Sequence, residues 1–101
     1  MEKTEILVIC RHPEILATIV RLINNKPEWN ATGCETDEQA INAFKNISCK
    51  LVLIGAGVTP SSELHLCQAF TAHNPQVKIV QHYGGGSGLL FAEIYGALGI
   101  N

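Results

Sequence analysis

Four residues of the sequence stand out because their side chains can carry out chemistry and lie near predicted strand ends. Cys10, Arg11 and His12 follow one another directly, and His82 stands alone much later in the chain. A cysteine thiolate and imidazole rings are ligands that suit zinc or copper. A positively charged neighbour also favours the thiolate form of a cysteine, which is its nucleophilic form. The residue types therefore raise two possibilities, a soft metal site and a reactive cysteine.

A glycine-rich segment is the second place where a ligand could bind. It consists of Gly84, Gly85, Gly86, Ser87 and Gly88, and we expect it between a strand and the start of a helix. Exposed backbone amides and the helix dipole can bind an anion at such a position. The spacing matches neither the P-loop nor the dinucleotide-binding glycine motif. Glycines also make the ordering of a loop costly in entropy, so anion binding and a mobile loop both remain open.

The composition excludes several classes of protein. The 101 residues predict a single domain over 1–101. Hydrophobic residues make up 47% of the chain and charged residues 16%, which argues against intrinsic disorder. Seven basic and nine acidic side chains leave no basic excess for a nucleic-acid backbone. No apolar run reaches the roughly 18–20 residues that cross a bilayer, and the first residues lack the pattern of a signal peptide. We therefore expect a cytoplasmic protein that binds neither nucleic acid nor membrane.

The four cysteines favour neither a zinc site nor a disulfide framework. Cys10, Cys34, Cys49 and Cys67 include no pair with the C-x-x-C spacing that zinc sites usually have. A chain with this much apolar content can fold without disulfides. We expect most of these cysteines to be small buried hydrophobic residues, and we expect no metal or other cofactor.

Apolar runs and helix breakers divide the chain into alternating strands and helices. Short apolar runs predict strands over 5–10, 29–34, 50–55 and 77–81. Helices are predicted to begin near Pro13, near Thr36 or Asp37, and near Thr59, and a last helix is predicted over 89–98. Such alternation with short connections implies a parallel sheet with right-handed crossovers and helices on both faces.

The carboxyl ends of the strands are where such sheets gather their functional groups. That edge would carry the segments 10–12, 55–57 and 82–84. The first and fourth strands should be separated by the third, which puts Cys10 and His82 about 10 Å apart at the backbone. A shared metal site is therefore not expected.

Five segments carry a distinctive order of apolar and polar residues. They are ILVICRHPEI (6–15), TDEQAINAFKN (36–46), KLVLIG (50–55), VTP (58–60) and AEIYGALGIN (92–101). Together they resemble the receiver domain of bacterial response regulators, the last segment being similar to its fourth helix. The resemblance implies a flavodoxin-like, CheY-like α/β fold with three layers, αβα, and a four-stranded parallel sheet of order 2-1-3-4. It also implies that the fifth strand and helix of the family are missing.

The resemblance implies that the chemistry of the family has been lost. Receivers hold a divalent cation with an acidic pair after the first strand, and the matching residues here are Cys10 and Arg11, with His12 next. The phosphate-accepting aspartate matches Gly55, and the Ser or Thr that binds the phosphoryl group matches His82. A phosphoaspartate needs a carboxylate nucleophile and a hard cation held by oxygen ligands. We therefore expect a degenerate receiver: a non-catalytic module for signal transduction or protein interaction.

A second function remains as the alternative. Cys10 has a position similar to that of the phosphocysteine in sugar phosphotransferase carriers of the IIB type, which would make the chain a small phosphocarrier or anion-binding component. The loop that follows departs from a phosphate cradle, because Pro13 lacks an amide and Glu14 adds a negative charge.

The last predicted helix indicates a protein partner. The stretch 88–100 carries one charge, Glu93, and apolar residues cover most of its circumference. A surface helix normally has a polar face, so we expect a second subunit to cover this one in a two-fold homodimer. The expected interface residues are Leu90, Phe91, Ile94, Tyr95 and Leu98.

Overall fold

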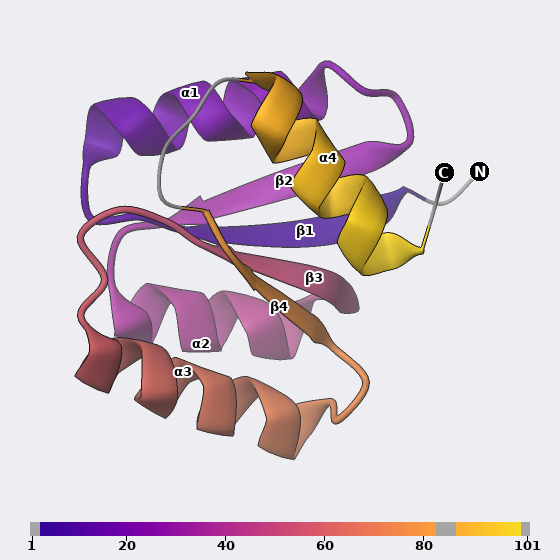
Figure 1. Ribbon diagram of the computed structural model, residues 1–101. Helices are drawn as coiled ribbons and strands as arrows, with labels where there is room; N and C mark the ends of the chain where they lie inside the picture. The colour runs from indigo at the N-terminus through magenta and orange to yellow at the C-terminus, as the bar shows by residue number, and fades with distance from the viewer. Residues whose placement is uncertain (1–2, 83–86, 100–101) are drawn as a thin grey trace.

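The chain alternates strands and helices throughout the described part (Figure 1). The structure is a computed structural model and describes residues 3–82 and 87–99. The elements, in chain order, are β1 (Thr4–Ile9), α1 (Pro13–Asn24), β2 (Trp29–Cys34), α2 (Asp37–Asn46), β3 (Cys49–Ile54), α3 (Pro60–His73), β4 (Lys78–Gln81) and α4 (Ser87–Leu98). The sequence-based order of elements is confirmed, and the observed strands differ from the expected ones by one residue or none at each end.

The helices begin where the sequence provides a cap or a proline. The hydroxyl of Thr36 accepts a hydrogen bond from the amide of Gln39 at 3.1 Å, and the hydroxyl of Thr59 accepts one from the amide of Ser62 at 3.2 Å. These bonds satisfy amides that have no partner within the helix. Pro13 opens α1 at a position where the missing proline amide costs nothing.

All four strands are parallel, and their order in the sheet is β2-β1-β3-β4. The expected strand order is therefore confirmed. The central strands β1 and β3 are buried on both faces over residues 6–9 and 51–54. Burial on both faces explains why these strands appear in the sequence as unbroken apolar runs.

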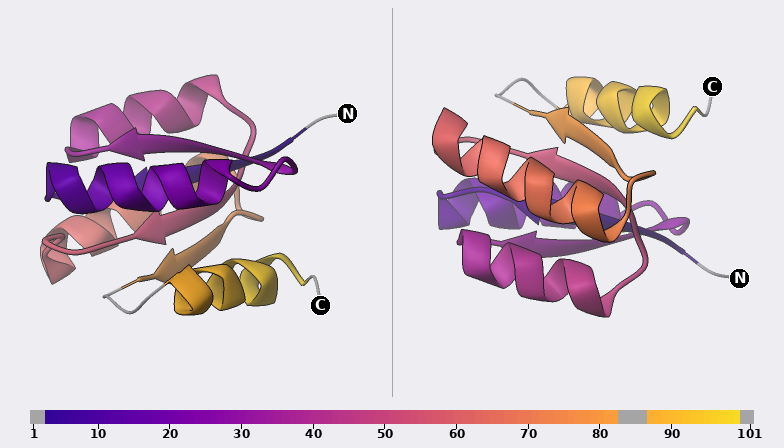
Figure 2. Two further views of the ribbon diagram at one scale, coloured as in Figure 1. Left: turned by 90° about the horizontal axis from the view of Figure 1, so that it is seen from above. Right: turned by 90° about the horizontal axis from the view of Figure 1, so that it is seen from below.

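Two hydrophobic cores lie on opposite faces of the sheet. Figure 2 shows α1 and α4 on one face and α2 and α3 on the other. Side chains of β1 and β3 alternate between the two cores, as strand geometry requires. The first core contains Ile6, Val8, Leu16, Ile19, Ile23, Trp29, Leu51, Leu53, Leu90 and Ile94, and the second contains Leu7, Ile9, Phe44, Val52, Ile54, Leu66 and Phe70. Among the described residues, no helix is long and apolar enough to span a membrane.

The face on which α4 lies has a topological consequence. α2 and α3 both connect a strand to one further toward the β4 edge, and both lie on the same face. Because parallel crossovers are right-handed, a helix leading to a strand beyond β4 would lie on that face as well. α4 lies on the opposite face, beside α1. In this structure α4 therefore covers β3 and β4 and is not placed as a crossover helix to a neighbouring fifth strand.

Candidate functional site

The carboxyl ends of β1, β3 and β4 carry most of the predicted site. Cys10 directly follows β1, Gly55 follows β3, and His82 follows β4. Cys10 and Gly55 are in contact, since a β-carbon built on Gly55 would lie 3.3 Å from the Cβ of Cys10. His82 is turned away toward α4 and has a different partner. Of the glycine-rich segment, Gly84, Gly85 and Gly86 lie outside the described residues, and Ser87 and Gly88 are the first two residues of α4.

Cys10 is a core residue in the structure. It is fully buried, and its thiol donates to the carbonyl of His12 with an Sγ–O distance of 3.6 Å. It belongs to the apolar cluster that also contains Leu16 and Leu90. A thiol in these surroundings has no access for a phosphodonor, so no observation favours the phosphocarrier alternative. His12, in contrast, is exposed.

The other cysteines are free thiols in apolar surroundings. Cys34 and Cys49 are buried and Cys67 is half-buried. Burial raises the pKa of all three thiols, and for Cys67 the nearby Glu63 raises the pKa further. The expectation that the cysteines are mostly small buried hydrophobic residues is thus confirmed.

Arg11 connects three segments of the carboxyl edge. Its side chain forms an ion pair with Asp37 in the first turn of α2, and its Nη1 donates to the carbonyl of Glu35 at 2.8 Å. Its backbone amide donates to the carbonyl of Ala56 at 3.0 Å. Arg11 thereby ties the loop after β1 to the start of α2 and to the loop after β3. Sequence reasoning identified Arg11 but missed Asp37, because the two residues are 26 positions apart.

Two positions of the loop after β3 have space for glycine but not for a larger residue. A β-carbon on Gly55 would lie 3.2 Å from the carbonyl oxygen of Ile9, against backbone that cannot move freely. Gly57 has φ +87°, and a β-carbon there would lie 2.6 Å from the Cβ of Arg11. L-residues with side chains rarely adopt this φ. The two glycines therefore let the loop close tightly on Cys10 and Arg11.

His82 links β4 to α4. Its side chain is 7% exposed, its Nδ1 contacts the carboxylate of Glu93, and its amide donates to the carbonyl of Ile54 at 2.8 Å. A buried polar ring needs such a partner. The signal for this pair was present in the sequence, since Glu93 is the one charge in an otherwise apolar helix. In the described part of the chain, no three His, Cys, Asp or Glu residues come together as metal ligands do.

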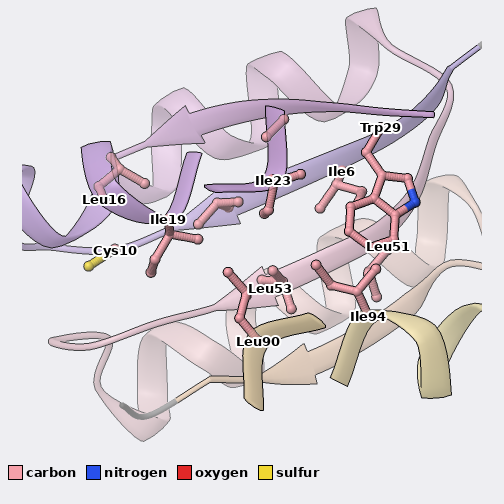
Figure 3. Close-up of a cluster of buried hydrophobic side chains, with 12 residues drawn as sticks. Ile6, Cys10, Leu16, Ile19, Ile23, Trp29, Leu51, Leu53, Leu90 and Ile94 are labelled. Carbon is pink, nitrogen blue, oxygen red and sulfur yellow. The ribbon is translucent and has the colours of Figure 1, made fainter. Parts of the chain in front are cut away.

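The proposed interface on α4 needs a correction at two of its residues. Leu90 and Ile94 are buried within the chain, where they point toward Leu51 and Leu53 of β3 (Figure 3). The apolar character of α4 is thus explained in part by the core of its own protomer, and neither residue is free to bind a second subunit.

The remaining interface residues are half-buried. The rings of Phe91 and Tyr95 pack on Trp29 with centroid distances of 6.0 and 5.1 Å. The ammonium group of Lys26 lies 5.0 Å from the centroid of the Phe91 ring. Leu98 packs against the same core. These contacts occupy much of the side of α4 that faces α1.

Comparison with known proteins supports the fold. No protein-family model matches the sequence, and no curated protein matches it. Solved structures do: the signal receiver domain of an HD domain-containing protein from Pseudomonas fluorescens Pf-5 is 17% identical with a TM-score of 0.71, covering 98% of this chain and 78% of that one.

Two further structures have the same architecture. A response regulator receiver domain protein from Clostridium thermocellum is 17% identical with a TM-score of 0.65, covering 93% of this chain and 77% of that one. The non-phosphorylated receiver domain of the stress response regulator RcsB from Escherichia coli is 14% identical with a TM-score of 0.65, covering 99% of this chain and 79% of that one. The chain therefore has the fold of response-regulator receiver domains.

Proposed function

We propose that the protein is a degenerate receiver, a cytoplasmic signal-transduction module that binds a protein partner and is neither phosphorylated on aspartate nor an enzyme. The observation that carries this proposal is the arrangement of Arg11, Asp37 and Gly55 at the carboxyl edge of a sheet with the receiver fold. Each of these residues is held by contacts with its neighbours, so these contacts fill the place where a receiver would bind a cation and phosphate.

Among the described residues of this edge, none provides a free carboxylate nucleophile together with oxygen ligands for a cation. An aspartyl phosphate forms when a carboxylate oxygen attacks phosphorus and the donor's leaving group departs. Gly55 offers no nucleophile after β3. A divalent cation would normally screen the charge of the incoming phosphate, but Arg11, whose backbone amide binds the loop after β3, brings a positively charged guanidinium to this edge, and that charge opposes a cation. Asp37 is the nearby carboxylate, and it is held by Arg11.

Fixed contacts take the place of a switch in this proposal. Arg11 holds the start of α2 to the loop after β1, and the His82–Glu93 contact holds α4 to β4. Both links join groups of the chain itself, so neither needs a phosphoryl group to form. The module would therefore keep one conformation, and its signal would depend on which partner is bound and when.

Intact-mass spectrometry tests the proposal directly. We expect no added phosphoryl mass after incubation with acetyl phosphate and Mg²⁺, and no change of the Gly55 and Gly57 amide resonances on addition of beryllofluoride. The variant D37N removes the carboxylate held by Arg11, and C10S removes the thiol. A phosphoryl adduct on the parent protein that D37N abolishes would overturn the proposal. An adduct that C10S abolishes would instead revive the phosphocarrier function.

Reintroducing the missing carboxylate is a stricter test. We expect G55D to remain unphosphorylated, because Arg11 still opposes a cation, and to unfold at lower urea than the parent, because its β-carbon meets the Ile9 carbonyl. Phosphorylation of G55D would mean that the edge retains a working cation site.

A further inference from the structure

β4 presents a row of backbone groups that no described strand pairs with. It is at the margin of the sheet, paired on its inner side with β3. The amide of His82 donates to the carbonyl of Ile54 on β3, and backbone groups of successive residues point to opposite sides of a strand. Val80 therefore also faces β3, whereas the amide and carbonyl groups of Ile79 and Gln81 point outward.

The side chains of β4 also alternate, pointing in turn to the two faces of the sheet. Val80 packs in the core shared by α1 and α4, and His82 contacts α4. Ile79 packs in the core shared by α2 and α3, and Gln81 contacts Glu63 of α3. Lys78, two residues before Val80, is exposed on the α4 side, where it lines a hollow with Ala97 and Leu98.

We propose that β4 is the dimer interface of this protein, pairing antiparallel with β4 of a second copy across a two-fold axis at Val80. The two sheets then form one continuous sheet. The proposal concerns a surface separate from the Arg11–Gly55 edge, so it holds or fails independently of the proposed function.

The register follows from the directions of the backbone groups. Outward-facing residues must meet outward-facing residues, which pairs Ile79 with Gln81 of the second copy. Residues paired in this way exchange both of their hydrogen bonds, and the two-fold axis repeats the pair. Val80 then faces Val80 of the second copy at a position without hydrogen bonds, where side chains approach most closely.

Charges on the α4 side are complementary in this register. Lys78 lies directly opposite His82 of the second copy, and His82 contacts Glu93 within its own protomer. The exposed ammonium group of Lys78 thus comes within reach of the Glu93 carboxylate of the other copy. The two-fold axis repeats this attraction.

The helices leave room for this arrangement. α4 packs over both β3 and β4, so the two copies of α4 lie about two strand spacings apart, which is close to the usual ~8–10 Å between packed helices. Helix periodicity places Gly96 and Glu93 on the side of α4 turned away from Phe91 and Tyr95. Apart from α4 itself, no described residue has an atom within 4 Å of where a Gly96 β-carbon would be, so the second helix can approach there.

An apolar hollow on the α3 side provides a third complementary feature. It has a volume of about 360 Å³ and is lined by Val58, Pro60, Glu63, Leu64, Cys67 and Gln81. Leu64, one of the lining residues, is 61% exposed, so its apolar side chain is open to a second copy. Ile79 of the second copy lies opposite Gln81 and therefore at the mouth of this hollow, next to Leu64.

Light scattering coupled to size-exclusion chromatography tests the dimer over a range of concentrations, with Q81P and Q81A as matched variants. Both variants lose the Gln81 side chain, but only Q81P loses the backbone amide that points outward from β4. In both variants the hydrogen bonds between β3 and β4 are kept. We expect Q81P to weaken association about tenfold or more, since it removes hydrogen bonds on both sides of the axis. Q81A should stay close to the parent.

Charge exchange tests the register. We expect K78E to weaken the dimer and the double variant K78E/E93K to restore it. K45E is the control, because it makes the same charge change on the last turn of α2, away from β4. Circular dichroism checks that each variant is folded, and K78E against K45E decides the question even if E93K disturbs the contact with His82.

Three results would overturn the proposal. One is a monomer at every concentration. Slow hydrogen exchange of the Gln81 amide in such a monomer would mean that another part of the same chain covers β4. Another is a dimer that Q81P leaves intact, which would place the interface elsewhere on the molecule. The last is equal weakening by K78E and K45E. The supporting result is slower hydrogen exchange of the Ile79 and Gln81 amides as the concentration rises.

Discussion

At the scale of single residues, the close packing of the carboxyl edge depends on glycines as well as on the side chain of Arg11. Gly57 turns the chain with a φ of +87° directly above the Cβ of Arg11. Arg11 in turn places its guanidinium between Glu35 and Asp37. A change at Gly57 would therefore disturb the loop after β3 and the start of α2 together.

We expect G57A to lower the free energy of unfolding by about 2 kcal/mol or more, because it adds backbone strain and a close contact. G96A is the matched control: it makes the same change at an exposed helical site with open space, and it should stabilise the monomer by about 0.5–1 kcal/mol. Urea denaturation of both variants at low concentration measures the difference. Equal stability of G57A and the parent would show that the loop can relax around a methyl group.

The sequence predicted where the candidate residues would lie better than what they would do. Position follows from the alternation of elements, which is why Cys10, Gly55 and His82 were assigned correctly to strand ends. Partners depend on packing between distant segments, which no local pattern reveals. Asp37 as the partner of Arg11 could therefore be identified only from the fold, and so could the complete burial of Cys10. For His82 the sequence offered one signal, the single charge Glu93 in an otherwise apolar helix, but it did not show that the two side chains meet.

At the scale of elements, α4 differs most from expectation. The existence and length of α4 were predictable from its apolar run. Which of its sides packs on the sheet was not predictable. A helix that is apolar on most sides gives no periodic signal that selects one side for the core. The structure selects Leu90 and Ile94 for the sheet and places Phe91 and Tyr95 on Trp29.

The contact between α4 and Trp29 can be followed by fluorescence. We expect F91A to cost about 2–3 kcal/mol of stability, somewhat less than a fully buried phenylalanine would, and to shift the Trp29 emission to longer wavelength as water reaches the indole. L64A is the control, since Leu64 is exposed and distant from Trp29. An unchanged emission spectrum in F91A would mean that α4 does not shield Trp29 in solution.

At the scale of the whole molecule, two cores share the central strands β1 and β3. Cys10 lies in the core under α1 and α4, and Cys34 and Cys49 lie in the core under α2 and α3. If β1 or β3 left one core, side chains of the other core would be exposed to solvent as well. The fold should therefore respond to solution conditions as one unit.

Alkaline pH is one such condition. Burial raises the pKa of Cys34 and Cys49 above the ordinary thiol value of 9.0. Well below pH 9 both thiols are protonated in the folded and unfolded states, so they leave stability unaffected there. As the pH rises through 9, the unfolded chain releases protons that the folded chain retains, and stability falls. We expect the urea midpoint to decline from about pH 9 upward, and less steeply in the variant C34A, which lacks one of these thiols.

The cysteines also report whether the two cores unfold together. Labelling with a thiol reagent in increasing urea should modify half-buried Cys67 first, and Cys10, Cys34 and Cys49 only at the unfolding transition. Because β1 and β3 contribute to both cores, we expect those three thiols to become reactive at one urea midpoint, which should coincide with the change in Trp29 fluorescence. Peptide mapping after labelling assigns each modified residue. If Cys34 and Cys49 reacted at lower urea than Cys10, the helices α2 and α3 would open separately from the rest, and the sheet would be held mainly by α1 and α4.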